Sequence, residues 1–514
     1  MKFLIFCGIY ICLVLIRLGF SISESYIHPD EHLQGIQVVA GNILNIKVEY
    51  PWEFKGQFPI RSIGPLLIIY GLPLKISQWI SGDTPVNPLF IFFLLRVFFF
   101  GLSFFIGRKF FKWRELFYND EDWFIYTSTP LKYRRKALLI YASSFVTWTY
   151  QTHTFSNSIE TIMVSICLFL IQKIKMNIRP WKCVLLAIFS SFGFFSRITF
   201  PIVLLPFVAS FSKSLIKRPK IIFSIIKSFM LMFFIFILID SFYYANGYRV
   251  IITPLNNFKY NSKYINLQKH GIHSYWTHFL INVPILLGPA IILPIIVKNI
   301  KFNLYLISSV LYILILSLFP HQELRFLLPV FPLLIIYLSS LGNIRKKKIR
   351  YLFIFSWIIY NIFFGIFLGF FHQHDVISII FFLKKYLVND SSANVVFWKT
   401  YPPPTWLFLD PPDSKIIFSH LIGYSVNNVL DYLSIKKQNG VKSIFIFPTL
   451  LIEKLPCVFE ELRNSSCKTN VTLRQIFKTS YYIGLDDSDF INNNIFFVLM
   501  DLIRKKGLVV CEVI

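Results

Sequence analysis

The chain has 514 residues, of which 55% are hydrophobic and 18% are aromatic, and its mean hydropathy is +0.59. Soluble domains are usually about 45–50% apolar with about 25% charged residues, but only 15% of this chain is charged. Long apolar runs recur from end to end, so the composition excludes a soluble globular protein and predicts a helical protein that crosses the membrane many times.

The net charge of +26 does not by itself indicate a nucleic-acid partner. The basic residues gather between apolar runs, which is the pattern of cytoplasmic loops and accounts for much of the charge. If the basic stretches 108–136, 173–182, 213–220, 298–301 and 345–350 face the cytoplasm, simple alternation places the unusual polar clusters on the opposite side. We therefore expect no nucleic-acid partner and one membrane face that is rich in functional groups.

The first apolar segment, residues 3–20, follows a lone Lys2. A signal peptide is the alternative interpretation, but the apolar stretch is long for one and no small-residue cleavage site follows it. We predict a retained spanning helix. The polar loop after it, residues 21–61, contains an amphipathic stretch around Leu33, Ile36 and Val39, which we expect to lie in the plane of the membrane interface.

Loop 21–61 also contains the adjacent acids Asp30 and Glu31, in a chain with only 26 Asp and Glu residues. One interpretation is structural: Asp30 caps a short helix that begins near Glu31. The other is chemical, because an acid in a loop beside the membrane is suitably placed to act as a general base on a hydroxyl group. Asp30 is the first choice for that base and Glu31 the second.

Apolar runs continue at 63–80 and 89–107. If loop 21–61 is lumenal, this part of the chain must cross the membrane an odd number of times, and we expect 63–80 to be re-entrant or interfacial. Farther on, Arg197 interrupts the apolar run 183–212. Three interpretations stay open for it: an internal pair with Asp240, an anchor at a helix break, and the binding of an anionic headgroup.

Loop 245–279 is rich in amides, imidazoles and aromatic rings, and it includes His270 and His273. Aromatic faces stack on sugar rings, and amides and imidazoles hydrogen-bond to hydroxyl groups, so the mixture suits a sugar. The alternative is an ordinary loop that satisfies its own hydrogen bonds.

Two further polar clusters carry histidines. His321-Gln-Glu-Leu-Arg325 is either an Arg–Glu pair that closes a helix junction or a phosphate site, since a guanidinium recognises phosphate with two parallel hydrogen bonds. His372-Gln-His-Asp375 has the residue types of a metal site, but its spacing is weak evidence for one. We expect no bound metal.

The tail from residue 376 alternates β-type apolar runs at 394–398, 443–447 and 508–513 with helix-like stretches at 427–436 and 490–504. This alternation predicts a small α/β domain. Sequons at Asn389, Asn464 and Asn470 agree with a lumenal position, where Cys457 and Cys467 are able to pair.

The predicted fold is therefore an all-α polytopic membrane module, residues 1–375, with roughly 10–12 transmembrane or re-entrant helices. A small lumenal α/β domain, residues 376–514, follows it. The first lumenal loop, 21–61, is the expected catalytic loop.

Several of these stretches together resemble the glycosylphosphatidylinositol (GPI) mannosyltransferases, which are GT-C type multispanning enzymes. The stretches are His28-Pro-Asp-Glu31 with Gln34, Pro51-Trp-Glu-Phe54, Arg61-Ser62, Thr154-Phe-Ser-Asn-Ser-Ile-Glu-Thr161, Arg197-Ile-Thr-Phe200 and His321-Gln-Glu-Leu-Arg-Phe-Leu-Leu-Pro329. His153 stands where an Arg is more usual in this family. Three stretches resemble the branch that adds the fourth mannose: Thr253-Pro-Leu-Asn-Asn-Phe-Lys-Tyr-Asn261, the segment from His270 to Pro289, and Thr400-Tyr-Pro-Pro-Pro404.

This resemblance implies an enzyme of the endoplasmic-reticulum membrane with a lumenal active site. It would transfer mannose from dolichol-phosphate mannose to the third mannose of a GPI precursor, forming an α-1,2 link with inversion. The resemblance implies Asp30 as the base and no cofactor, because the lipid donor is a substrate. The residues that we expect to contact substrate or shape the site are His28, Trp52, Glu53, Arg61, Ser62, Arg197, His270, His273, His321, Glu323, Arg325 and His372.

Other functions stay open on the sequence alone. Within the same class, the acceptor is another GPI mannose or a dolichol-linked oligosaccharide. A lipid or sugar transporter is the rival from another class, although transporters carry their acids on broken helices near the bilayer midplane, and the acids here lie in surface loops. A structural subunit of a glycosylation complex is the third possibility.

Overall fold

The computed structural model describes residues 2–82, 86–106, 124–298, 300, 302–390, 392–438, 440–455, 471–484 and 506–514. Within these ranges the chain forms two compact units, each assembled from segments that are separate in sequence. The first unit comprises Met1–Ser21, Tyr50–Pro73 and Leu95–Gly365, and the second comprises Ile22–Glu49, Leu74–Leu94 and Ile366–Ile514. The predicted boundary at 375/376 separates a membrane module from a lumenal domain and stays a prediction.

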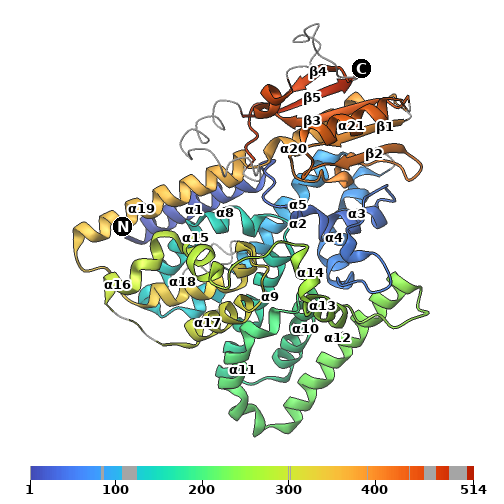
Figure 1. The fold of residues 1–514 in the computed structure, drawn as a ribbon. Coiled ribbons are helices and arrows are strands. Elements are labelled where there is room, and N and C mark those ends of the chain that lie inside the picture. Colours follow the sequence, from blue (N-terminus) through green and yellow to red (C-terminus); the bar gives the residue numbers. More distant parts are fainter. Residues whose placement is uncertain are drawn as a thin grey trace. The chain divides into compact units, whose positions relative to one another are not determined.

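The first unit is helical (Figure 1). Helices α4 (Gly64–Ser81) and α5 (Pro88–Leu102) contribute to both units. The other helices of the first unit are α1 (Lys2–Ser21), α6 (Phe124–Ser128), α7 (Arg134–Ala142), α8 (Phe145–Trp148), α9 (Ser156–Met176), α10 (Pro180–Ser196), α11 (Phe200–Ile216), α12 (Pro219–Ala245), α13 (Thr253–Asn261), α14 (Tyr264–Gln268), α15 (Val283–Leu287), α16 (Leu293–Val297), α17 (Leu304–Ser317), α18 (Phe331–Ser340) and α19 (Lys347–Ile366).

Among the described residues, five helical segments are long and apolar enough to cross a membrane: Leu4–Ser21, Pro88–Phe105, Pro219–Ala245, His278–Val297 and Lys347–Phe371. The pair Phe145–Thr152 and Ser156–Met176 forms a sixth candidate, bent by 107°. Four shorter apolar helices accompany them: Pro180–Ser196, Phe200–Ser210, Leu304–Ser317 and Leu324–Ser340. The prediction of a helical protein that passes the membrane several times is confirmed, whereas a re-entrant 63–80 stays a prediction.

Arg197 lies between two helices, as the interruption of the apolar run predicts. Helix α10 ends at Ser196, and α11 begins at Phe200 with Pro201 in its first turn, where a missing N–H costs nothing. The two helices pack closely because Gly193 has no side chain: a Cβ atom there would lie 2.4 Å from the ring of Phe200. The tight helical hairpin therefore presents Arg197 at its turn.

The second unit contains a five-stranded sheet, drawn in orange and red in Figure 1. Its strands have the order β2-β1-β3-β5-β4. Strands β2 and β3 both pair with β1 in parallel, and β5 pairs antiparallel with β3 and β4. The strands are β1 (Ser392–Phe397), β2 (Lys415–His420), β3 (Ser443–Pro448), β4 (Leu473–Lys478) and β5 (Leu508–Val513), and the helices of the unit are α2 (Asp30–Leu33), α3 (Ile36–Ile43), α20 (His374–Tyr386) and α21 (Val426–Gln438).

The predicted α/β character of the tail is confirmed: the three predicted strands correspond to β1, β3 and β5, and the stretch 427–436 lies in α21. The sequence does not predict strands β2 and β4, because neither is a continuous apolar run: β2 alternates exposed and buried positions, and β4 has only one buried residue and carries Arg474, Gln475 and Lys478 at exposed positions. Cys457, Cys467, Asn464, Asn470 and the predicted helix at 490–504 lie outside the described residues.

The amphipathic stretch after the acids is packed inside the protein on most sides, and its place in the plane of the membrane interface stays a prediction. In α3, Ile36, Val38 and Val39 are fully buried, and so is Gln37, whose amide donates to the carbonyl oxygen of Glu49 at 2.5 Å. The sequence does not reveal this packing, because a buried Gln and an exposed Gln are indistinguishable by hydropathy.

Asp375, at the start of α20, connects this helix to residues 481–482, which belong to the same unit but lie far away in the sequence. Its carboxylate accepts the backbone N–H groups of Tyr481 and Tyr482 at 2.9 and 2.8 Å. Burial alone would raise the pKa of Asp375, but hydrogen bonds from His374, Thr479 and these two N–H groups hold the pKa below its ordinary value. The carboxylate therefore stays charged and fixes residues 481–482 against 374–375.

Replacing Asp375 by Ala leaves two N–H groups without their acceptor. Hydrogen bonds to a charged group contribute about 1.5–3 kcal/mol, so we expect Asp375→Ala to lower the free energy of unfolding by about 2–3 kcal/mol. Thermal unfolding of the purified chain in detergent measures the change. The control is Asp390→Ala, which removes a partly exposed ion pair with Lys442 and should cost less than about 1 kcal/mol.

The effect of Asp375 has a defined pH dependence. Because its pKa is lower in the folded than in the unfolded chain, the stabilisation is complete above the ordinary aspartate pKa of about 3.9 and is lost as the pH falls below it. The difference in melting temperature between the wild type and Asp375→Ala should be large at pH 7 and shrink below about pH 4. A difference that does not change with pH would contradict this role.

Candidate active site

The candidate residues fall into two groups, one in each unit. The second unit contains His28, Asp30, Glu31 and His372. The first unit contains Trp52, Glu53, Arg61, Ser62, Arg197, His270, His273, His321, Glu323 and Arg325. Each group is described within its own unit.

Asp30 is the first residue of α2 and not its cap. The cap position belongs to Pro29, which makes no side-chain capping bond, so the structural interpretation of Asp30 is wrong. The backbone N–H of Asp30 donates to Nδ1 of His28 at 3.1 Å, and the side chain of Asp30 is 19% exposed. The carboxylate is thus partly accessible beside a partly accessible imidazole.

Glu31 has a different environment from its neighbour. Its side chain is fully buried, its Oε2 atom accepts the backbone N–H of Ile27 at 3.3 Å, and Nε2 of His32 lies 3.8 Å from its Oε1 atom. The carboxylate of Glu31 therefore closes the turn 27–31 from inside the unit. Of the two acids, only Asp30 has a solvent-accessible side chain.

The structure brings His372 to the same segment. Nε2 of His372 lies 3.3 Å from the hydroxyl of Tyr401, and the ring of Tyr401 also packs beside His28, with ring centres 6.1 Å apart. Tyr401 is a residue that the sequence analysis did not select, although it lies in the quoted stretch 400–404. His374 lies beside Asp375 and contributes to its hydrogen bonds, and Asp375 holds the backbone of Tyr481 and Tyr482. Among the described residues, no group of three or more His, Cys, Asp or Glu is suited to a metal.

In the first unit, three arginines each face a carboxylate; we call them the arginine cluster, Arg61, Arg197 and Arg325. Arg61 donates through Nε and Nη2 to Oε1 of Glu53, both at 3.1 Å. Arg325 donates through Nε and Nη2 to the two carboxylate oxygens of Glu323, the second at 2.8 Å. The Arg–Glu pair predicted as one interpretation of 321–325 is therefore present.

Arg197 has a weaker partner than the other two. Its Nε atom lies 3.7 Å from Oε2 of Glu160, and its Nη1 atom is buried without a hydrogen-bond partner among the described residues. Arg197 and Arg325 both lie over the ring of Phe326, 5.5 and 5.1 Å from its centre. Burial lowers the pKa of Arg197 to about 10, and the positive charges of Arg61 and Arg325 act in the same direction, so Arg197 stays charged at neutral pH.

The proposed pair of Arg197 with Asp240 is not formed. Glu160, at the start of α9, is the carboxylate that faces Arg197, and it also accepts from Thr199 at 2.8 Å. Glu160 lies in the stretch 154–161, but its role could not be predicted, because the sequence does not reveal which cation a lone acid in an apolar helix faces.

Next to the arginine cluster lies a group of rings, Trp52, Tyr260, His270, His273 and His321, which we call the ring cluster. Trp52, 46% exposed, packs on Tyr260 and His270 with ring centres 4.7 and 5.2 Å apart. His321 lies 5.9 Å from both His270 and His273, and its Nε2 atom is 2.7 Å from Oε1 of Glu323. Glu323 therefore joins the ring cluster to the arginine cluster.

Side chains from α12 and α13 hold the backbone around Arg61. The carbonyl oxygens of Pro59, Ile60 and Arg61 accept from Asn256, Asn257 and the hydroxyl of Tyr244, at 3.0, 3.3 and 2.7 Å. Each of these amides therefore uses one N–H inside the protein, as in the alternative of a loop that satisfies its own hydrogen bonds, and sugar binding by the loop stays a prediction.

Asp240 completes this arrangement. One carboxylate oxygen accepts from Ser62 Oγ at 3.0 Å and from the N–H of Ile63 at 2.9 Å, and the other accepts from Thr253 at 2.7 Å. Ser62 thus anchors the loop, which is one of the two roles expected for it. The segment 59–63, which carries Arg61, is fixed at each of its five positions.

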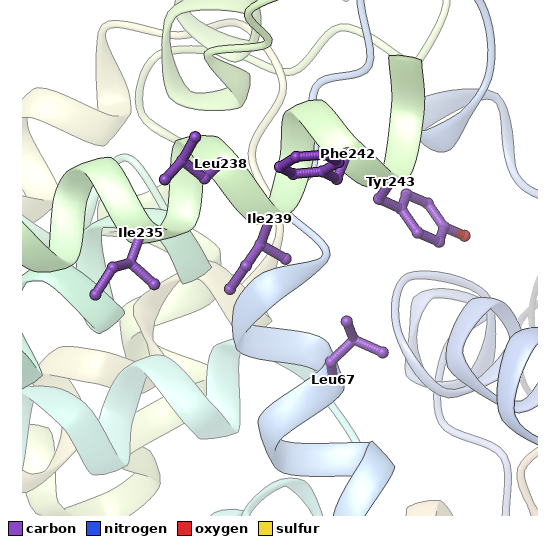
Figure 2. Close-up of a pocket in the computed structure, with 6 residues that line it drawn as sticks. All are labelled: Leu67, Ile235, Leu238, Ile239, Phe242 and Tyr243. Atoms are coloured by element: carbon purple, nitrogen blue, oxygen red, sulfur yellow. The ribbon is translucent and has the colours of Figure 1, made fainter. Parts of the chain in front are cut away.

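An apolar pocket of about 540 Å³ lies beside this segment in the first unit. Figure 2 shows its lining, with Leu67 from α4 facing the side chains of α12. The lining residues are Leu67, Ile235, Leu238, Ile239, Phe242 and Tyr243. Ile239 precedes Asp240 directly, so the pocket ends close to the residues that hold Arg61. Its lining suits a hydrocarbon chain.

Comparisons with known proteins agree on one family. Residues 8–410 match the model of the Alg9-like mannosyltransferase family. A protein of Aspergillus oryzae named GPI mannosyltransferase 4 is 34% identical over 98% of this chain and 97% of its own length. Proteins of the same name from Schizosaccharomyces pombe and Saccharomyces cerevisiae are 35% and 36% identical, over 94% and 84% of this chain and 91% and 79% of their own.

A solved structure shares the fold. ArnT from Cupriavidus metallidurans, bound to undecaprenyl phosphate, superposes with a TM-score of 0.52 over 98% of this chain and 97% of its own. At 8% sequence identity this likeness concerns the fold alone. The predicted GT-C type fold with a small C-terminal sheet is confirmed.

The bond between Ser62 and Asp240 is testable by a double-mutant cycle on the free energy of unfolding. Residues that share a hydrogen bond couple by about 0.5–3 kcal/mol, so Ser62→Ala combined with Asp240→Asn should cost less than the sum of the single changes by that amount. The control combines Ser62→Ala with Asp431→Asn on the exposed side of α21, where the two effects should add. Additive effects of Ser62→Ala and Asp240→Asn would show that the bond carries no stability.

Proposed function

The chain belongs to the Alg9-like mannosyltransferase family, and we propose that it adds the fourth mannose to GPI precursors. It is a multi-pass membrane glycosyltransferase of GPI synthesis. The donor is dolichol-phosphate mannose, the acceptor is the third mannose of the precursor, and the product has an α-1,2 link formed with inversion. The reaction takes place at the lumenal face of the endoplasmic-reticulum membrane.

The contrast between the two adjacent acids carries the assignment of the base. Asp30 is partly exposed and starts a helix, whereas Glu31 is buried and holds the turn. A general base must come within hydrogen-bond reach of the hydroxyl from which it takes a proton. We assign this role to Asp30, with His28 beside it as a residue that shapes the site.

In the proposed reaction, the acceptor hydroxyl attacks the anomeric carbon of the donor while Asp30 takes the hydroxyl proton. The bond between the anomeric carbon and the phosphate oxygen breaks, and dolichol phosphate leaves with the electron pair. A single displacement inverts the anomeric centre. The protein lowers the barrier by stabilising the negative charge that develops on the leaving phosphate.

The arginine cluster suits that leaving phosphate. Arg61 and Arg325 each donate two hydrogen bonds to a glutamate, whereas Nε of Arg197 lies 3.7 Å from the carboxylate of Glu160, and Arg197 stays charged. We therefore assign the donor phosphate to Arg197 first. ArnT, a neighbour in fold, was solved with undecaprenyl phosphate, which is a polyprenyl phosphate like the proposed donor lipid.

The remaining candidates have subsidiary roles in this proposal. Trp52, which is 46% exposed, offers an aromatic ring for a sugar, with His270 stacked on it and His273 and His321 behind His270. Glu53 and Glu323 orient Arg61 and Arg325, and Ser62 anchors the loop. No metal or cofactor takes part in the proposed reaction.

The first test is mannose transfer in microsomes that lack the native enzyme, with labelled dolichol-phosphate mannose and a three-mannose GPI acceptor. Loss of a general base typically costs about 10²–10⁴-fold, so Asp30→Asn should make almost no four-mannose product at equal abundance. Glu31→Gln should lower the amount of folded protein more than the activity per molecule. Asp413→Asn, at an exposed position of the tail, is the control and should match the wild type.

Three outcomes are informative. Equal product from the wild type and Asp30→Asn would remove Asp30 as the base. Normal abundance with no activity in Glu31→Gln would move the base to Glu31. No four-mannose product from stably inserted wild type would contradict the proposed acceptor.

The assignment of Arg197 predicts a change in donor affinity. Hydrogen bonds to a charged group contribute about 1.5–3 kcal/mol, or roughly tenfold to a hundredfold, so Arg197→Gln should raise the KM for dolichol-phosphate mannose by about that factor. The KM for the GPI acceptor should not change. The control, Arg350→Gln on the exposed side of α19, should leave both constants unchanged. An effect of Arg197→Gln on the acceptor alone would contradict the assignment.

A further inference from the structure

The sheet of the second unit has a feature that the proposed reaction does not use. Its parallel part has the order β2-β1-β3, so the chain moves from β1 to one side and then crosses to the other. In open α/β sheets with this order, functional residues gather where the strand order reverses, at the carboxyl ends of the strands. The segment that leaves β1 at this point is 398–404.

This segment is fixed on several sides within the second unit. The hydroxyl of Tyr482 donates to the carbonyl oxygen of Lys399 at 3.1 Å, and Lys399 has a left-handed backbone, with φ of 56°. The N–H of Tyr401 donates to Gln373 at 3.2 Å, and the hydroxyl of buried Tyr26 donates to the carbonyl oxygen of Pro402 at 2.9 Å. The backbone on both sides of the Tyr401 side chain is therefore held.

The side chain of Tyr401 connects three parts of the second unit. Its ring meets Tyr26 edge to face, with centres 5.5 Å apart, and lies 6.1 Å from the ring of His28. Its hydroxyl lies 3.3 Å from Nε2 of His372, which is 5% exposed. Tyr26 and His28 belong to the segment that leads directly into Asp30.

We propose that Tyr401 is a positioning residue of the transferase: it holds His28 and His372 in one arrangement and thereby sets the orientation of Asp30. In this proposal the C-terminal sheet contributes to catalysis, because Tyr401 lies in the segment that directly follows its strand β1. The inference rests on the proposed function through the role of Asp30. It concerns the second unit alone.

Two substitutions separate the contribution of the Tyr401 hydroxyl from that of its ring. The hydroxyl joins the ring to His372, and the ring itself packs against Tyr26 and His28. Tyr401→Phe removes only the first contribution, and Tyr401→Ala removes both. Tyr424→Phe is the matched control, because Tyr424 follows β2 at the same end of the sheet and its side chain is 44% exposed.

The test measures kcat and KM for both substrates with the full purified chain in lipid nanodiscs. Loss of one hydrogen bond predicts that Tyr401→Phe lowers kcat about fivefold to tenfold, and loss of packing beside a reacting group predicts about a hundredfold for Tyr401→Ala. Both KM values should stay within about twofold of the wild type, because a positioning residue acts on the reacting group and not on ground-state binding. Tyr424→Phe should match the wild type.

Amide hydrogen exchange of residues 26–34 provides a readout that needs no activity. Tyr401→Ala should accelerate exchange there, and Tyr424→Phe should not. If Tyr401→Ala accelerates exchange while the wild type transfers no mannose, the proposed function is wrong, but the packing of Tyr401 against residues 26–28 is confirmed. Unchanged kcat in Tyr401→Phe and Tyr401→Ala, or a raised KM at constant kcat, would overturn the positioning role. If Tyr401→Ala does not fold, Tyr401→Phe alone decides the kinetic result.

Discussion

Burying charge in an apolar protein is costly unless each charge meets an opposite charge or several hydrogen bonds. Four buried charged residues of the first unit illustrate this constraint: Arg61, Arg197 and Arg325 each face a glutamate, and Asp240 accepts three hydrogen bonds. A membrane protein with few acids has thus placed several of them beside its buried arginines. Removing one partner would leave an uncompensated charge, which makes these positions interdependent.

The pairs differ in how many hydrogen bonds the guanidinium donates to its glutamate, and the proposed roles of the arginines rest on this difference. Arg325 is held by two hydrogen bonds to Glu323, whereas Arg197 is 3.7 Å from Glu160. An anion that reaches Arg197 gains a charged partner without first breaking a strong pair. The second unit shows the same division between Glu31, which closes a turn, and Asp30, which stays accessible.

Much of the architecture could be predicted from the sequence, because long apolar runs, basic loops and β-type runs depend on local composition. The helix break at Arg197 and strands β1, β3 and β5 are examples. Partners distant in sequence could not be predicted: Glu160 and not Asp240 faces Arg197, and Tyr401 reaches His28 across more than 370 residues. Composition likewise could not show that Asn256 and Asn257 bind the backbone near Arg61.

The most direct test of the account is the structure of the product. The purified chain would receive labelled dolichol-phosphate mannose with GPI precursors that carry two or three mannoses, and the product would be treated with a mannosidase specific for α-1,2 links. The account predicts label only on the three-mannose precursor, and its complete release by that enzyme. Label on the two-mannose precursor, or label that resists the mannosidase, would contradict the account.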